Sequence, residues 1–232
     1  MEHELSTITI LLNRLVESFT GTDPHLPDQG VVAWFIVVFL AVIFVPMSRR
    51  FSIDTPGWGQ QMLEIGVESI NAMLDGFIGP EGRKYFPVLG GFGVFILLSN
   101  LITNVPGFQP PTADLNTTVV LGVMSFLFYN FLGIRAQGTE YAKQFIGDPV
   151  WMAPLMIPIE ILSHLSRPLS LSIRLFGNIF AEHTLAGVFF ILLPFGLPLV
   201  FAPLGVFVAF MQTFVFIMLS MVYIAGALEH GH

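Results

Sequence analysis

Long apolar runs alternate with short polar stretches along this chain. Five apolar runs occupy residues 31–45, 86–105, 117–134, 150–193 and 200–227. A helix needs about 20 predominantly apolar residues to cross a bilayer, and the longest of these tracts far exceed what a helix in a soluble core needs. The pattern therefore predicts an all-α integral membrane protein.

The runs define a single integral membrane domain over residues 31–232, preceded by an N-terminal extracytoplasmic segment, 1–30. The tract 150–193 is about twice the length of a normal span, so it either bends into two spans or lies steeply tilted. Phe195-Gly196-Leu197-Pro198 is the expected break after it. The domain would begin with one span at 31–47 and an amphipathic surface helix at 57–78. A transmembrane hairpin would follow at 86–134, and a hairpin of two long tilted membrane helices at 150–228.

Residues 57–78 have apolar positions at helical spacing on one face and acidic or amide side chains on the other. The apolar face carries Met62, Ile65, Ile70, Met73 and Phe77, and the polar face carries Glu64, Glu68, Asn71 and Asp75. Such a helix lies on a membrane surface. Because anionic lipid repels an acidic face, we favour contact with a partner subunit or with loops of this chain. A surface helix without a partner fits the pattern equally well.

Lys and Arg concentrate in the cytoplasmic loops of membrane proteins. In this chain the basic loop positions are Arg49-Arg50, the loop 80–84, Arg135 and Lys143, whereas the proline-rich turn 106–116 has none. These loops agree on one topology, with the N-terminus outside and the C-terminus in the cytoplasm. The acidic start, Met1-Glu2-His3-Glu4, lacks the basic character of a signal or transit peptide. These features fit a bacterial plasma (inner) membrane, a plastid-encoded copy being the alternative.

A polar stripe runs through the long tract between Pro158 and Ala186. At about 100° per residue, six side chains fall within roughly 40° of one line on a helix. They are Glu160, His164, Arg167, Arg174, Asn178 and Glu182. Each centrally placed Arg or acid costs about 2.5–3.5 kcal/mol to insert, so the stripe must face protein or water. Such a stripe indicates an ion path by default.

Arg174 lies at the centre of the stripe. At about 1.5 Å per residue, Glu160 is about 21 Å from it toward the cytoplasm and Glu182 about 12 Å beyond it. A guanidinium keeps its proton at any working pH, so Arg174 can repel cations or hold a carboxylate ionised, but it cannot relay protons. No other span of this chain supplies a carboxylate. We therefore infer that the partner carboxylate belongs to another subunit.

Two other polar groups have structural alternatives. His164 and Arg167 could simply neutralise Glu160 from the next two turns of one helix. Gln212 is the notable polar residue of the last tract and would lie near the depth of Arg174 in an antiparallel hairpin, where its amide could orient the guanidinium. A helix–helix hydrogen bond worth about 0.6 kcal/mol is the competing explanation for Gln212.

The composition supports a membrane protein and excludes several other classes. Hydrophobic residues make up 54% and charged residues only 11% of the 232 residues. A net charge of −7 offers no basic patch for nucleic acid. The chain has no cysteine, and it contains no paired-His metal motif, nucleophile motif or phosphate-binding loop. We expect no cofactor, no bound metal and no catalytic residue.

Several segments carry a family resemblance. Pro168-Leu-Ser-Leu-Ser-Ile-Arg174-Leu-Phe-Gly-Asn178 closely resembles the signature of subunit a of the F-type ATP synthase, and Met211-Gln212-Thr-Phe-Val-Phe resembles that family's last-helix motif. Asn100-Leu-Ile to Pro106-Gly-Phe, together with Pro111-Thr-Ala-Asp-Leu-Asn116, resembles its outer hairpin. The resemblance covers most of the chain from about residue 60.

The resemblance implies a proton-translocating stator subunit that performs no nucleotide chemistry itself. Subunit a packs against the rotating ring of subunit c and offers two offset aqueous half-channels to the ring carboxylate. Arg174 matches the arginine that keeps this carboxylate charged and blocks a direct leak. The other matched positions on the proton path are Asn178 and Gln212 near the arginine, Glu160 in the cytoplasmic half-channel, and Ser163 and Ser170 on the same helix. We further expect the lipid bilayer and the subunit b stator stalk as partners, the stalk through residues 57–78.

One departure concerns the outer half-channel. Many bacterial members have a small residue followed by Glu where this chain has Glu182-His183. The position on the last helix that carries the acid in the mitochondrial pattern is Gly205 here. We therefore predict that Glu182 and His183 together form the outer relay, since a histidine with a pKa near 6.5 suits proton transfer.

An autonomous ion channel or secondary transporter is the alternative function. It would need its own carboxylate opposite Arg174 or a visible internal repeat, and the sequence shows neither. A purely structural scaffold would leave the central Arg174 unexplained.

Overall fold

The computed structural model describes residues 9–10, 13, 28–48, 51–52, 57–104, 109–138, 141, 153–192 and 197–229. All regular structure in these residues is helical, so the predicted all-α fold class is confirmed. The α-helices are α2 (Asp28–Ser48), α3 (Trp58–Phe77), α4 (Phe86–Leu101), α5 (Leu115–Gln137), α6 (Ala153–Leu192) and α7 (Leu197–Glu229). Short 3-10 turns occur at η1 (Pro80–Tyr85), η2 (Ile102–Asn104) and η3 (Pro111–Ala113).

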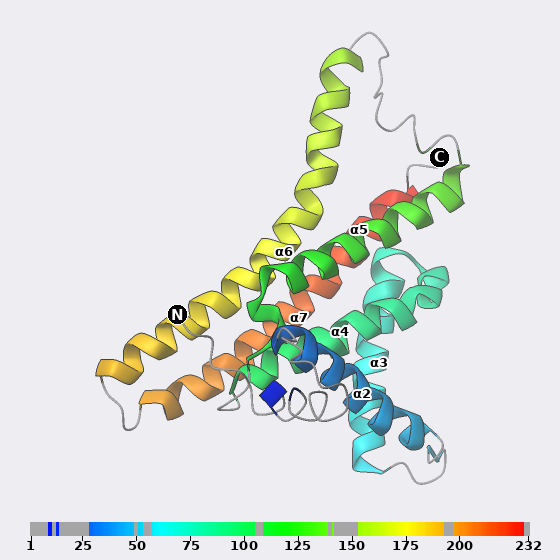
Figure 1. Cartoon of the computed structure of the whole chain (residues 1–232). Helices are drawn as coiled ribbons and strands as arrows, with labels where there is room; N and C mark the ends of the chain where they lie inside the picture. Colours follow the sequence, from blue (N-terminus) through cyan, green and yellow to red (C-terminus); the bar gives the residue numbers. More distant parts are fainter. Residues whose placement is uncertain are drawn as a thin grey trace.

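The four C-terminal helices form the body of the molecule. In Figure 1, α6 and α7 run side by side along the diagonal, with α5 and α4 packed against them and α3 crossing below. Figure 1 also shows α6 changing direction, so that its N-terminal part projects away from the other helices. Pro158 and Pro168 lie inside α6, and proline is the usual cause of a sharp bend because it removes a backbone hydrogen bond. The long tract is therefore one bent helix of 40 residues.

Short-range signals fix the ends of the α4–α5 hairpin. Asp114 precedes α5 in an extended conformation, and its side chain accepts a hydrogen bond from the backbone N–H of Asn116, which satisfies one of the free donors at the helix start. After α5, Gly138 has a φ of +61°, a conformation that favours glycine. The hairpin thus begins and ends its second arm at residues suited to those positions.

Two clusters of buried side chains hold the helices together. One joins Leu74 of α3 to Leu89, Tyr129 and Met221, from α4, α5 and α7 respectively. The other joins Ile96, Leu121, Leu171, Leu175 and Phe216, so that α4, α5, α6 and α7 all contribute. Helices α4, α5 and α7 contribute to both clusters, whereas α3 joins the first and α6 the second.

Close helix contacts depend on small residues. A Cβ added at Gly122 of α5 would overlap the Ser172 hydroxyl and lie 2.8 Å from the Pro168 carbonyl oxygen of α6. At Gly93 of α4 the obstacle would be the end of the Ile217 side chain, at 2.6 Å. Small residues let helix backbones approach closely in membrane proteins, and Gly122 does so here where α5 packs against the backbone of α6, the helix that carries the polar stripe.

The observed elements lie close to the predicted ranges. Helix α2 begins at Asp28 rather than at residue 31, and α5 continues to Gln137 rather than ending at 134. Four helices are long and apolar enough to cross a membrane, counted over the described residues: Gln29–Pro46, Pro80–Asn104, Leu115–Gln137 and Pro203–Leu228. Most of the segment 1–30, Arg49-Arg50, residues 106–108 of the expected turn, Lys143 and residues 195–196 of the expected break lie outside the described residues. The other two residues of that break, Leu197 and Pro198, already belong to α7.

Candidate ion path

The polar stripe of α6 is not uniformly exposed. His164 is only 3% exposed, and Glu160, Arg167, Asn178 and Glu182 are half-buried. The side chain of Arg174 lies exposed at the outer surface of the helix bundle. Along α6, the side chains of the stripe therefore change from buried near α5 and α7, at His164, to exposed on the outer face of the bundle, at Arg174.

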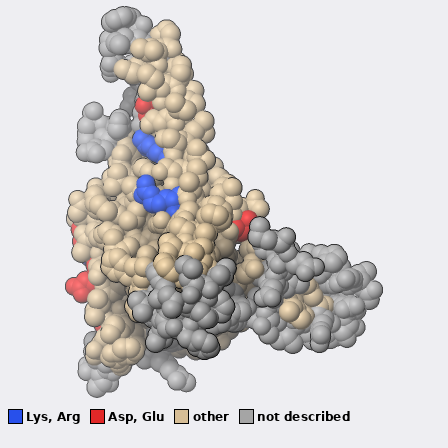
Figure 2. Space-filling model, turned by 90° about the vertical axis from the view of Figure 1, so that its left-hand side faces the viewer, with Lys and Arg blue, Asp and Glu red and all other residues tan. Residues whose placement is uncertain are grey.

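Arg174 has few contacts within the chain. Its Nη2 reaches the Ser170 hydroxyl at 3.5 Å, one helical turn away. Among the residues that the structure describes, no carboxylate lies within ion-pair distance of its guanidinium. Figure 2 shows two patches of basic side chains on one face of the molecule, with tan, uncharged residues around them and acidic side chains above them and at the edges of the view. An exposed guanidinium on such a face is free to meet a carboxylate of another molecule.

Asn178 connects the stripe to the last helix. Its Nδ2 donates a hydrogen bond to Oε1 of Gln212, which is only 4% exposed. The sequence placed Gln212 near the depth of Arg174, and the contact is made to Asn178, one turn along α6. The buried amide pair fixes the register of α6 against α7 beside the guanidinium.

Glu182 points across the α6–α7 hairpin toward Gly205. A Cβ added at Gly205 would overlap the Glu182 carboxylate and lie 2.8 Å from Oδ1 of Asn104. The carboxylate and the amide therefore occupy space that any side chain at Gly205 would fill. The carboxylate on α6 thus lies beside the position on the last helix at which this chain has glycine.

A cavity of about 370 Å³ opens at this point. Its lining includes Asn178, Glu182 and His183 from α6, Gly205 from α7, and Asn104 from η2. Although Glu182 and His183 are adjacent in the sequence, both side chains reach the same cavity. The arrangement suits proton transfer because a carboxylate, an imidazole and two amides surround a space that is large enough for water.

A second polar cluster lies toward the other end of the stripe. Nε2 of His164 lies 3.4 Å from Oε1 of Glu160, and Nδ1 lies 3.3 Å from the hydroxyl of Tyr129 on α5. The Arg167 guanidinium stacks over the rings of Tyr129 and Tyr223, at 5.8 and 5.3 Å. Arg167 thus makes cation–π contacts with α5 and α7. Of the alternative in which both basic groups neutralise Glu160, the structure places only His164 beside the carboxylate.

The two serines predicted on the path differ in their contacts. The hydroxyl of Ser170 lies near the Arg174 guanidinium, as described above. Ser163 is half-buried, and its backbone carbonyl accepts a hydrogen bond from the Ser166 hydroxyl. Ser163 lies on the same stretch of α6 as Glu160 and Arg167.

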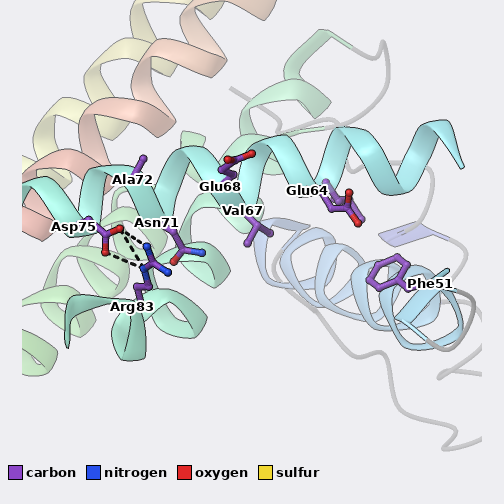
Figure 3. Close-up of a pocket in the computed structure, with 9 residues that line it drawn as sticks. Phe51, Glu64, Val67, Glu68, Asn71, Ala72, Asp75 and Arg83 are labelled. Carbon is purple, nitrogen blue, oxygen red and sulfur yellow. Dashed lines mark hydrogen bonds and ion pairs between the residues drawn. The ribbon is translucent and has the colours of Figure 1, made fainter. Parts of the chain in front are cut away.

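A groove lies along the acidic face of α3. Figure 3 shows Glu64, Glu68 and Asp75 facing it, with Phe51 at one end and Arg83 of η1 at the other. Nε of Arg83 donates to Asp75 at 2.9 Å, and this contact lowers the pKa of the Asp75 carboxyl below its ordinary value. One end of the acidic face therefore packs on this chain's own loop, while Glu64 and Glu68 stay open to another partner.

Potential metal ligands do not gather into a site among the residues that the structure describes.

Comparison with known proteins decides the family. The family model for the ATP synthase A chain matches residues 30–225. The chain belongs to this family. ATP synthase subunit a 1 of Syntrophotalea carbinolica is 44% identical over 230 residues, covering 96% of this chain and 98% of that protein. ATP synthase subunit a of Geobacter sulfurreducens is 42% identical over 212 residues, covering 90% and 92%. The subunit a of Trichlorobacter lovleyi is 42% identical over 232 residues, covering both chains completely.

The family and the four apolar helices together establish a membrane protein. Sequence reasoning missed two residues that lie beside the stripe in the structure, on other elements. Tyr129 contacts His164, and Thr103 lines the cavity beside Glu182. The sequence offered one sign of Tyr129, because it is the only tyrosine in the apolar run 117–134.

Proposed function

We propose that this chain is the proton-translocating stator subunit of an F-type ATP synthase. It provides two aqueous half-channels to a carboxylate on the ring of subunit c, and Arg174 blocks the direct leak between them. The observation that carries the proposal is the exposed Arg174 on the outer face of α6, without a carboxylate partner among the described residues. A permanent cation at mid-membrane depth is too costly to retain without a partner.

The c-ring carboxylate is the partner that the chemistry requires. A carboxylate opposite the guanidinium stays ionised, because an adjacent opposite charge favours the charged form. As the ring turns, each carboxylate gives up its proton on one side of Arg174 and gains one on the other. The alternative of an autonomous channel or transporter lacks support, since the described spans bring no acid to Arg174.

The outer half-channel is assigned to the cavity at Glu182. Glu182 and His183 exchange protons with water there, and Asn178 leads from the cavity toward Arg174 with Gln212 holding its amide. The contact between Glu182 and Gly205 supports this assignment, because the carboxylate reaches the helix on which relatives of the mitochondrial pattern carry the acid.

The inner half-channel is assigned to the opposite end of the stripe. Glu160 is half-buried there, so that its carboxylate reaches the edge of the bundle, and Ser163 and Ser170 offer hydroxyl groups between it and Arg174. Proton carriers on both sides of a fixed cation give two separate paths, as rotary coupling requires.

The remaining partners follow from the surface. The stator stalk of subunit b is proposed to use α3, where Glu64 and Glu68 line a groove of about 620 Å³. The bilayer covers the apolar faces of the spans. The orientation proposed is an extracytoplasmic N-terminus and a cytoplasmic C-terminus, in a bacterial inner membrane.

Substitution of Arg174 tests the proposal. ATP-driven proton uptake and passive proton leak would be measured in inverted vesicles that carry the assembled complex with Arg174→Ala, beside a Gly226→Ala control on α7. We expect pumping to be lost while the complex assembles, and an increased leak would mark Arg174 as the barrier between the half-channels. Pumping near the wild-type rate would show that Arg174 is structural and would overturn the proposal.

A further inference from the structure

We infer that His164 is a positioning residue for proton transfer through Glu160, held in place by the hydroxyl of Tyr129. This inference rests on the proposed function, because it concerns the inner half-channel assigned above. The structure supplies a bridge of three side chains from two helices, in which the imidazole lies between a carboxylate and a phenol.

His164 is a buried titratable residue in a part of α6 whose neighbouring leucines are exposed. Its neighbours Leu162 and Leu165 are 70% and 57% exposed, whereas His164 is 3% exposed. A buried imidazole in a membrane helix is retained only where polar groups meet it. Here the ring stacks on Tyr129, with centroids 6.2 Å apart, and Nδ1 lies 3.3 Å from the Tyr129 hydroxyl. Nε2 lies 3.4 Å from the Glu160 carboxylate, near it but outside hydrogen-bond geometry.

Tyr129 determines which nitrogen of His164 carries the proton. Tyr129 is 1% exposed and is held by the rings of Phe126 and Tyr223. When its hydroxyl donates to Nδ1, the proton of the neutral imidazole lies on Nε2. That nitrogen is the one that faces Glu160. The phenol therefore keeps a donor directed at the carboxylate.

The consequence concerns the geometry of Glu160. A glutamate side chain at the edge of the bundle has several rotamers, and a fixed donor one turn away selects the one that keeps its carboxylate on the stripe. The charged and titratable groups around the imidazole are Glu160 and Arg167 on α6, Tyr129 on α5, and Tyr223 on α7 through its contact with Tyr129. Arg167 lies over the two tyrosine rings, which leaves His164 as the positioning group for the carboxylate.

A double-mutant cycle tests the inference. ATP-driven pumping and assembly with the c ring would be measured in inverted vesicles for His164→Leu, Glu160→Gln and the double variant. His164→Leu should lower pumping about tenfold, within the range of coupling between side chains in direct contact, because it removes the imidazole that lies 3.4 Å from the carboxylate. If His164 acts through Glu160, the double variant should pump no worse than Glu160→Gln alone.

Two further variants separate positioning from packing. His164→Gln keeps an N–H donor near the position of Nε2 and should restore most of the pumping. Ser125→Ala removes a buried contact of similar kind, the 3.0 Å contact to Ser220, without touching Glu160, and should pump within about twofold of wild type.

The outcomes distinguish the inference from the function on which it rests. Losses that multiply in the double variant, or no recovery in His164→Gln, would overturn the positioning role and leave the proposed function standing. Wild-type pumping by Glu160→Gln would remove Glu160 from the path and overturn the inference with it. The Arg174→Ala experiment would then decide the rest of the proposed function.

Discussion

At the outer cavity, Gly205 leaves room for the Glu182 carboxylate because glycine has no side chain. A Cβ there would overlap the Glu182 carboxylate and crowd Asn104. We expect Gly205→Ala to displace the carboxylate and to lower ATP-driven pumping by roughly tenfold to a hundredfold, the range seen when a reacting group is misplaced by about 1 Å.

The control for this substitution is Gly226→Ala on the same helix, because a Cβ at Gly226 would meet nothing within 4 Å. Both variants raise helix propensity by the same change, so propensity cancels in the comparison. Equal pumping by the two variants would show that Glu182 does not depend on the space at Gly205.

The contact between α3 and η1 gives a prediction about pH. The pKa of Asp75 is lowered, chiefly by its hydrogen bond from Arg83. A depressed carboxyl pKa contributes stability above the unfolded value of 3.8, and this contribution is lost as the pH falls through the lower folded value. The effect is small because the pair is exposed.

Hydrogen exchange in the segment 75–85, in protein embedded in nanodiscs, would measure the stability that the Asp75–Arg83 contact contributes. At pH 6 the wild type should be better protected than Asp75→Ala, and the difference should shrink progressively as the pH falls below 3.8, with exchange rates corrected for their intrinsic pH dependence. A difference that persists at low pH would assign the protection to packing around Leu74 instead.

The packing of α5 against α6 depends on a different kind of contact from that of α4 against α7. A Cβ at Gly122 would crowd the Pro168 backbone carbonyl, which cannot move without shifting α6. A Cβ at Gly93 would meet only the flexible end of Ile217. We expect Gly122→Ala to lower the thermal stability of the purified complex and Gly93→Ala to leave it nearly unchanged, as measured by loss of the subunit from the complex on heating. Equal effects would mean that helix spacing is not set at Gly122.

The elements of this molecule could be predicted from the sequence because they depend on local pattern. Hydropathy fixed the spans, periodicity fixed α3, and both lie near the predicted ranges. The polar stripe of α6 was equally visible, since it follows from angular spacing along one helix. What could not be predicted was contact across helices. The Tyr129–His164 contact joins residues 35 positions apart, and it depends on how α5 and α6 pack around Gly122.

At the scale of the whole molecule, the positions of the basic residues predict its orientation in the membrane. The basic residues of η1 and the end of α5 predict the cytoplasmic side, and the turn before α5 predicts the outside. Because the chain has no cysteine, a single introduced cysteine can be labelled without background. Glu81 and Asn116 are both exposed, and they lie at opposite ends of the α4–α5 hairpin.

We expect a membrane-impermeant maleimide to label Glu81→Cys in inverted vesicles and Asn116→Cys in right-side-out vesicles, each at least about tenfold better than in the other preparation. The same orientation places Glu160 toward the cytoplasm and Glu182 toward the outside, since α6 follows the cytoplasmic end of α5. Reversed labelling would exchange the entry and exit assigned to the two half-channels while leaving Arg174 between them. The orientation therefore decides in which direction the path runs, and the arginine substitution decides separately whether there is a barrier along it.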